Sequence, residues 1–187
     1  MLVTSEALPL AKTGGLADAV SGLARALRDA SVDATILMPA YPSALDAAIE
    51  LEMVAELPGL VGGDATVWAG WAADAEIPVL LLRNDALYMR PGNPYVDPDG
   101  REFPDNAIRF AALAQAAQRI SMGATPIRVP HIVHAHDWHA ALTPLYLHAA
   151  GVKRPKTVLT IHNLAFQGNF PLSLADELGI PPAYRGS

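Results

Sequence analysis

Cysteine is absent from the 187 residues, so the chain has neither a disulfide framework nor thiolate chemistry. Basic residues are few, because 13 Lys and Arg stand against 19 Asp and Glu and the formal net charge is -6. This balance offers no cationic surface to a nucleic-acid backbone or an anionic membrane. No apolar run approaches the roughly 20 residues that span a bilayer, and no cationic leader with a long apolar stretch is found. We therefore expect neither nucleic acid nor membrane among the partners, and a cytoplasmic location.

Short apolar runs alternate with segments of helical period in a chain that is 51% hydrophobic and 17% charged, a composition that suits one domain of ordinary size. This order predicts an α/β fold over residues 1–187, with a Rossmann-like, doubly wound, mostly parallel sheet and helices on both of its faces. The predicted strands are residues 1–3, 34–38, 79–82, 132–133 and 158–161, and the predicted helices are residues 16–27, 108–122 and 142–149.

Other segments carry weaker patterns. Residues 66–68 are expected to pair antiparallel with residues 77–82 at or beside the sheet edge. Residues 89–100 are dense in Pro, Gly, Asn and Asp, which predicts a surface loop. Residues 174–178 have the spacing of a short helix.

The segment KTGGLADAV, residues 12–20, places Lys12, Gly14 and Gly15 where an apolar strand gives way to an amphipathic helix. The first turn of a helix presents unpaired N–H groups and the positive end of the dipole, and glycine lets a phosphate approach that backbone closely. With Lys12 as a mobile cation, the segment has the parts of a diphosphate cradle, although it matches neither standard glycine-rich phosphate motif. The alternative is that the glycines only shape a tight turn and Lys12 is a solvated surface charge.

A second polar cluster, HIVHAHDWHA at residues 131–140, ends an apolar strand. Strand alternation places His134 and His136 on one face and leaves Asp137 at the carboxyl-terminal tip, where such sheets bind ligands. A carboxylate there can accept a hydrogen bond from a substrate hydroxyl, or it can cap the helix that follows. The histidines suggest a metal, but neighbours along one strand do not converge by themselves as the ligands of a zinc site. Structural roles for the histidines are the alternative.

A third strand runs into TIHNLAFQG, residues 160–168, and places His162 and Asn163 at its tip. His and Asn side chains can both donate and accept hydrogen bonds, which suits the hydroxyl groups of a sugar. The alternative is an ordinary loop in which Asn163 closes a turn and His162 is simply exposed. Polar clusters at three strand ends together favour a ligand site at this edge of the sheet.

The three motifs KTGGLADAV, HAHDWHA and TIHNLAFQG together resemble the bacterial glycogen synthases and plant starch synthases, retaining glycosyltransferases of the two-lobed GT-B architecture. The motifs stand in the family's order and the resemblance covers nearly the whole chain. It implies the Rossmann-like N-terminal lobe of a GT-B enzyme. It also implies transfer of glucose from ADP-glucose to the non-reducing end of an α-1,4-glucan such as glycogen, with retention and without a metal or other cofactor.

The same resemblance implies a role for each matching residue. His162 and Asp137 are the expected catalytic residues, His162 at the reacting face of the donor glucose and Asp137 in the acceptor or glucose site. In the implied mechanism, cationic side chains and helix N-termini stabilise the negative charge that develops on the departing ADP. The expected substrate-binding residues are Lys12, Gly14 and Gly15 at the donor's diphosphate, Asp18 in holding this segment or facing the acceptor, Tyr95 in positioning sugar, and Asn163 at a hydroxyl.

The family also places a second lobe after this one, with a catalytic-site glutamate, further cations and the nucleotide-base pocket. We therefore expect residues 1–187 to be the N-terminal lobe, nearly inactive alone, with the C-terminal lobe as its partner. Two other interpretations remain. One is a noncatalytic module that binds glucan or nucleotide sugar, with Trp68, Trp71 and Tyr95 stacked on sugar rings. The other is a His-based metallohydrolase.

Overall fold

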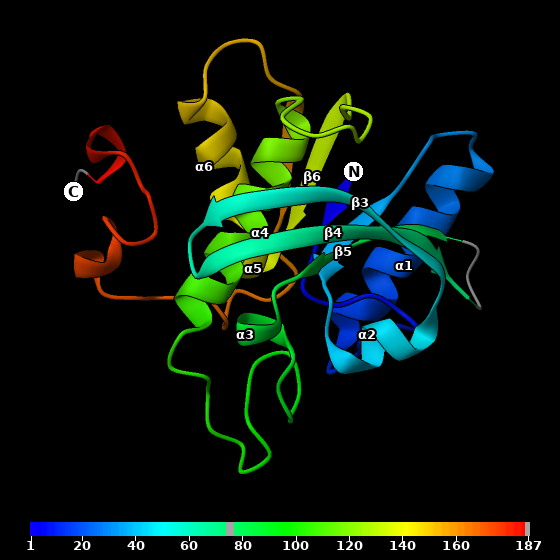
Figure 1. Ribbon diagram of the computed structural model, residues 1–187, viewed down its shortest axis with the longest axis horizontal. Helices are drawn as coiled ribbons and strands as arrows, with labels where there is room; N and C mark the ends of the chain where they lie inside the picture. Colours follow the sequence, from blue (N-terminus) through cyan, green and yellow to red (C-terminus); the bar gives the residue numbers. More distant parts are fainter. Residues whose placement is uncertain (74–76, 186–187) are drawn as a thin grey trace.

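Over residues 1–73 and 77–185, which the computed structural model describes, the chain folds around a seven-stranded sheet in the order β3-β4-β5-β2-β1-β6-β7 (Figure 1). At one edge, β3 (Ala48–Leu60) and β4 (Gly63–Ala72) form an antiparallel hairpin that continues antiparallel onto β5. The predicted doubly wound, mostly parallel sheet is confirmed. The parallel strands are β1 (Leu2–Val3), β2 (Ile36–Pro39), β5 (Ile77–Arg83), β6 (Ile132–His136) and β7 (Lys156–Thr160).

The strand order of the sheet reverses at β1. From β1 the chain passes through α1 (Gly15–Asp29) to β2 on one side, whereas the later α4 (Asn106–Ser121) leads to β6 on the other side. Because crossovers between parallel strands are right-handed, α1 covers one face and α4 the opposite face, where α6 (Leu142–Ala149) packs against α4 (Figure 1). At the carboxyl ends of β1 and β6, the loops that follow these two strands therefore turn toward opposite faces of the sheet. Open α/β sheets bind ligands at such a point.

The apolar patterns of the sequence follow from where each element is buried. Residues 36–38 of β2 and 79–82 of β5 are buried on both faces of the sheet, so their sequences show no alternation of polar and apolar residues. In α1, the predicted stripe buries Leu16, Val20 and Ala24 while the opposite side stays exposed. Among the described helices, none is long and apolar enough to cross a membrane.

The irregular elements differ most from the sequence prediction. The expected antiparallel pairing is confirmed, with Val67 of β4 opposite Leu82 of β5. The sequence pattern does not predict β3, because its pairing with β4 shifts register repeatedly and the two-residue alternation is lost. The helix predicted at 174–178 is wrong, since Leu174 ends a short 3-10 helix and residues 175–178 form turns. The shorter helical segments are α2 (Pro42–Ala47), α3 (Asp85–Tyr88), α5 (Asp137–Ala140), η1 (Leu172–Leu174) and η2 (Pro182–Tyr184).

The loop between α3 and α4 is fixed by a buried guanidinium. Arg109, which is 1% exposed, donates to the carbonyl oxygens of Leu87 at 2.8 Å and Pro94 at 2.9 Å. It also donates to Asn106 Oδ1 at 2.7 Å, and Asn106 Nδ2 donates to the carbonyl oxygen of Tyr95 at 2.9 Å. Burial lowers the pKa of Arg109 from its ordinary value. The loop therefore holds Tyr95 in a defined position.

An aromatic cluster joins this loop to α4 and α5. The imidazole of His139 stacks on Tyr95 with ring centroids 4.6 Å apart, and it lies edge-on to Phe110 of α4 at 4.8 Å. The indole of Trp138 lies 4.1 Å from the same imidazole. Burial lowers the pKa of His139 to about 3. His139 is thus a neutral side chain of the core, as the structural interpretation of this histidine expects.

We expect His139 to make the fold sensitive to acid. The pKa of His139 is about 3 in the folded chain, whereas the ordinary value for histidine is 6.5. Between these two pH values the unfolded state binds one more proton than the folded state, so stability falls as the pH falls. His139→Phe keeps an aromatic ring in the cluster and removes the titrating group. As the pH falls, the free energy of unfolding of this variant should decrease less steeply than that of the unaltered chain. The two slopes should differ by up to about 1.4 kcal/mol per pH unit. Urea unfolding at several pH values between 7 and 4 measures this slope.

Phe110→Leu is the control for this experiment, because it loosens the same cluster and keeps His139. It should lower the free energy of unfolding by a similar amount at every pH, since its effect is lost packing. Identical acid slopes for His139→Phe and the unaltered chain would contradict the assignment.

Candidate functional site

A buried carboxylate three residues after β1 holds the turn that begins at Lys12. Glu6 is 2% exposed, and its side-chain oxygens accept hydrogen bonds from the Thr13 hydroxyl at 2.6 Å and the Gly14 N–H at 3.2 Å. The Thr13 N–H and the Tyr95 hydroxyl donate to the same carboxylate. A buried carboxylate requires such donors, so Glu6 and this turn depend on each other. The sequence motifs predict no role for Glu6, and the signal that could have found it is a charge placed shortly after an apolar strand.

The fold does not require glycine at positions 14 and 15. Gly14 has φ -147° and ψ -160°, an extended conformation that other residues adopt, and Gly15 begins α1. A Cβ added to either glycine would meet no atom within 4 Å. The N–H groups of a first helical turn have no acceptor inside the helix. A tight turn therefore does not explain the glycines, and they leave a helix N-terminus that another molecule can approach closely.

Lys12 and Asp18 form an ion pair beside this helix N-terminus. Lys12 Nζ lies 2.8 Å from Asp18 Oδ2, and both side chains are about half exposed. An exposed pair of this kind contributes little to stability. Asp18 therefore holds the Lys12 ammonium close to the first turn of α1, and solvent still reaches that ammonium.

Tyr95 connects the Lys12 turn to the tip of β6. Its hydroxyl bonds to Glu6 and lies 2.8 Å from Ser5 Oγ, while its ring is stacked on His139 in α5. Burial, followed by the nearby Tyr41 and Glu6, raises the pKa of the Tyr95 phenol above its ordinary value. Both the ring and the hydroxyl of Tyr95 contact other residues of the protein, so Tyr95 connects the Lys12 turn with α5. A direct contact of Tyr95 with sugar stays a prediction.

The tip of β6 places Asp137 against the loop that leaves β7. Asp137 is 8% exposed and begins α5 with φ +55°, a left-handed conformation that aspartate tolerates better than most residues. Its Oδ1 accepts the backbone N–H of His162 at 2.7 Å. Because this bond goes to the neighbouring loop and not to the first turn of α5, helix capping does not explain the residue. Asp137 instead ties the tips of β6 and β7 together.

A row of imidazoles lies beside Asp137. His134 and His136 project from one face of β6, as strand alternation predicts, with ring centroids 4.1 Å apart. His136 Nδ1 lies 3.0 Å from His162 Nε2 in the exposed loop after β7. Burial, followed by the charges of His134 and His162, lowers the pKa of His136 to about 3. Burial also lowers the pKa of His134. His162 thus stands exposed at the end of a row whose inner members are neutral. The sequence motifs predict no role in the site for His136.

Asn163 follows His162 in the same loop. Its Oδ1 accepts the backbone N–H of Ala165 at 2.9 Å, which closes a turn as the alternative interpretation describes. Farther along, Gly168 has φ +61° and packs against the indole of Trp138, where an added Cβ would come within 2.4 Å of the ring. This close approach anchors the loop over α5. A contact between Asn163 and a ligand hydroxyl stays a prediction.

The other proposed chemistries find less support in the geometry. Among residues 1–73 and 77–185, no group of three or more His, Asp or Glu side chains is placed to hold a metal ion. His131 precedes β6, at the end of the strand opposite to Asp137. Trp68 and Trp71 are three residues apart in a regularly paired part of β4, so they project to opposite faces and form no common platform for a sugar.

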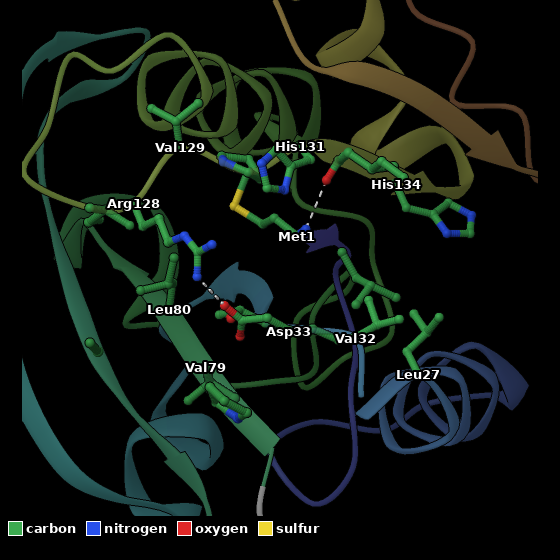
Figure 2. Close-up of a pocket in the computed structure, with 18 of the residues that line it drawn as sticks. Met1, Leu27, Val32, Asp33, Val79, Leu80, Arg128, Val129, His131 and His134 are labelled. Carbon is green, nitrogen blue, oxygen red and sulfur yellow. Dashed lines mark hydrogen bonds and ion pairs between the residues drawn. The ribbon is translucent and has the colours of Figure 1, made fainter. Parts of the chain in front are cut away.

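A cavity of about 950 Å³ lies away from Lys12, Asp137 and His162, although His134 of the imidazole row is among its lining residues. Figure 2 shows Met1, Val129 and His131 in the upper part of its lining and Leu27 and Val32 on the right. The described residues that line it come largely from the amino ends of the strands and are mostly apolar. The residues at the carboxyl ends of β1, β6 and β7 therefore form a separate site, at the edge where α/β sheets bind ligands.

Comparisons with known proteins show the family of this chain. The family model of the starch synthase catalytic domain matches residues 1–187. A glycogen synthase of Bordetella parapertussis is 57% identical over 189 residues, which cover 99% of this chain and 37% of the relative. A glycogen synthase of Ralstonia nicotianae is 51% identical over 183 residues, which cover 97% of this chain and 34% of the relative. The chain thus spans little more than a third of the length of these curated relatives.

A solved structure shares the fold over nearly the whole chain. It is the catalytic domain of starch synthase IV from Arabidopsis thaliana, bound to ADP and acarbose, and it matches with a TM-score of 0.76 and 27% sequence identity. The match covers 96% of this chain and 36% of that one. The three motifs, the sheet and these relatives lead to one conclusion: the chain belongs to the starch synthase catalytic domain family of glycosyltransferases.

Proposed function

We propose that this chain is the N-terminal lobe of a retaining glycosyltransferase that moves glucose from ADP-glucose to the non-reducing end of an α-1,4-glucan such as glycogen. One observation carries the proposal, a connected network at the carboxyl edge of the sheet. The Lys12 turn is bonded to Glu6, and Glu6 is bonded to Tyr95. Tyr95 is stacked on the helix that begins at Asp137, and Asp137 is bonded to His162. The protein therefore fixes these loops relative to one another, as a site for both a charged leaving group and a hexose requires.

The N-terminus of α1 suits the diphosphate of the donor. Gly14 and Gly15 leave backbone N–H groups uncovered, and Lys12 adds a positive charge beside them. Negative charge develops on ADP as the glycosidic bond breaks, and groups already in place stabilise it without reorganisation. The starch synthase IV structure was solved with ADP and acarbose, which supports a nucleotide and an oligosaccharide as ligands of this family.

The tips of β6 and β7 suit the transferred glucose and the acceptor. In Asp137 one carboxylate oxygen is committed to His162 N–H, which leaves the second oxygen for a sugar hydroxyl. The imidazole of His162 and the amide of Asn163 are exposed beside it and can serve further hydroxyls. In this proposal Asp137 and His162 act at the reacting glucose, and Asn163 binds substrate. Asp18 positions Lys12 or faces the acceptor.

Exposed apolar side chains support the inference that a further lobe covers this one. β7 stands at the end of the sheet order, and Ile161, Leu164 and Phe166 beyond it are 57%, 71% and 68% exposed. A large uncovered apolar area marks a contact surface. The chain spans 37% of the Bordetella parapertussis glycogen synthase, so a C-terminal lobe with the nucleotide-base pocket fits both observations.

We expect residues 1–187 alone to transfer almost no glucose, because the groups that hold the nucleotide base would lie in the other lobe. Incorporation of radiolabelled glucose from ADP-glucose into glycogen measures this. The comparison is the complete enzyme at equal concentration. Turnover by the 187-residue chain at the rate of the complete enzyme would contradict the lobe proposal.

Lys12→Ala in the complete enzyme should weaken ADP-glucose binding by tenfold or more, the approximate effect of losing one charge-assisted hydrogen bond. The free energy of unfolding should change by less than about 1 kcal/mol, because the Lys12–Asp18 pair is exposed. Calorimetric titration and urea unfolding give the two quantities. Asp18→Ala is the matched control, since it breaks the same ion pair and keeps the cation, and it should weaken ADP-glucose binding less than Lys12→Ala does. Equal losses of affinity in both variants would show that only the pair matters.

Gly15→Ala tests whether a ligand approaches the helix N-terminus. An added Cβ meets no atom of the protein, so the free energy of unfolding should stay the same or rise by up to about 1 kcal/mol. A phosphate at van der Waals distance would clash with the methyl group, so affinity for ADP-glucose should fall by about tenfold or more. Gly22→Ala, in the middle of α1 and equally open, is expected to stabilise the helix without changing affinity. An unchanged affinity in Gly15→Ala would rule out a cradle at this turn.

A further inference from the structure

The contact between two imidazoles leaves one buried nitrogen without a partner. His136 is 1% exposed, and its Nδ1 lies 3.0 Å from Nε2 of His162. The ring planes differ by 23° and the centroids are 5.3 Å apart, so the rings meet nitrogen to nitrogen and not face to face. Within residues 1–73 and 77–185, His136 Nε2 is buried and has no hydrogen-bond partner.

This second nitrogen decides which ring donates. If His136 Nδ1 accepted a proton from His162, a neutral His136 would carry its own proton on Nε2, and that buried N–H would be unpaired. If His136 Nδ1 donates, Nε2 holds only a lone pair. Unpaired buried N–H groups are rarer in proteins than under-used acceptors. Burial, together with His134 and His162, lowers the pKa of His136 to about 3, so a doubly protonated ring is excluded near neutral pH.

We propose that His136 is a positioning residue, which donates its Nδ1–H to His162 Nε2 and so keeps the proton of His162 on Nδ1. His162 then presents a hydrogen-bond donor to whatever binds at the exposed side of its ring, instead of a lone pair. This inference rests on the proposed function for its ligand: the donor would face an oxygen of the transferred hexose.

The surroundings hold the pair in the orientation that this requires. The ring of His136 stacks on His134 at 4.1 Å, and His134 Nε2 lies 2.7 Å from Thr160 Oγ1. On the other side, Asp137 Oδ1 accepts the backbone N–H of His162. When a hydrogen-bond partner fixes whether one ring nitrogen of a neutral histidine carries the proton, the protonation of the other nitrogen is fixed as well. His162 is therefore prepared before a sugar arrives, which avoids reorganisation at the moment of reaction.

Nuclear magnetic resonance of the 187-residue chain, labelled with 15N-histidine, tests the tautomer directly. Long-range 1H–15N correlation separates protonated from unprotonated ring nitrogens, and the variant His162→Gln identifies the signals of His162. At about pH 8, above the ordinary histidine pKa of about 6.5, we expect His162 with a protonated Nδ1 and an unprotonated Nε2. A proton on Nε2 of His162 would overturn the proposal.

Two substitutions at position 136 separate the hydrogen-bond donor from the bulk of the ring. The amide of Asn can donate from near the position of Nδ1, whereas Leu fills the buried space without a donor. His136→Asn should keep the proton of His162 on Nδ1, and His136→Leu should release the ring to a mixture of both tautomers. An unchanged tautomer in His136→Leu would overturn the proposal. If His136→Leu does not fold, the unaltered chain and His136→Asn still decide.

The same pair of variants gives a kinetic readout in the complete enzyme. His136→Leu should lower kcat by about tenfold, the approximate effect of one hydrogen bond made at the reacting group, and His136→Asn should recover most of it. Equal kcat values in the two variants would overturn the positioning role. The spectra need no ligand, so failure of ADP-glucose to bind would count against the proposed function alone, and a wrong tautomer would count against the role of His136 alone.

Discussion

The carboxylate of Glu6, withdrawn from water behind the Lys12 turn, is the interaction on which the site depends. It collects donors from residues 13 and 14 and from Tyr95, which lies 89 residues farther along the chain. A charge in such a place stays stable only while all of these donors remain, because losing one leaves the desolvation of the carboxylate uncompensated. The turn before α1 is therefore held by several hydrogen bonds to one buried side chain, although it lies at the surface.

A second buried charge completes the scaffold, and the two charges do not pair with each other. Arg109 donates to main-chain carbonyl oxygens of the loop between α3 and α4, while Glu6 accepts from N–H and hydroxyl groups of another irregular segment. Each charge thus organises backbone that lies outside helices and strands and would otherwise lack partners. Tyr95 is the link, since Arg109 and Asn106 fix its loop and its hydroxyl reaches Glu6. The position of the candidate site is set by these polar contacts as well as by the apolar core.

Much of the fold could be predicted because its signals are local. The buried strands and α1 have clear periods, and the carboxyl ends of parallel strands share one edge, so the convergence of the polar clusters at Asp137 and His162 follows from topology. The register shifts of β3 erase the local signal, and no period reveals it. Glu6, Arg109 and His136 were missed for a different reason: each role depends in part on a partner that is distant in the chain, which no local pattern reveals. Tyr95 was singled out from the family motif, but nothing local shows that its hydroxyl turns inward.

The left-handed backbone of Asp137 allows two requirements on this position to be told apart, namely tolerance of the backbone conformation and possession of a carboxylate. Such a conformation is open to glycine, asparagine and aspartate at little cost and to other residues only with strain. A single nucleotide change converts an aspartate codon into one for asparagine or glycine, so mutation has short routes that preserve the bend and discard the charge. Where descendants of this gene keep aspartate at the position, selection must be acting on the carboxylate itself, and the shape of the chain would not be enough to explain its retention.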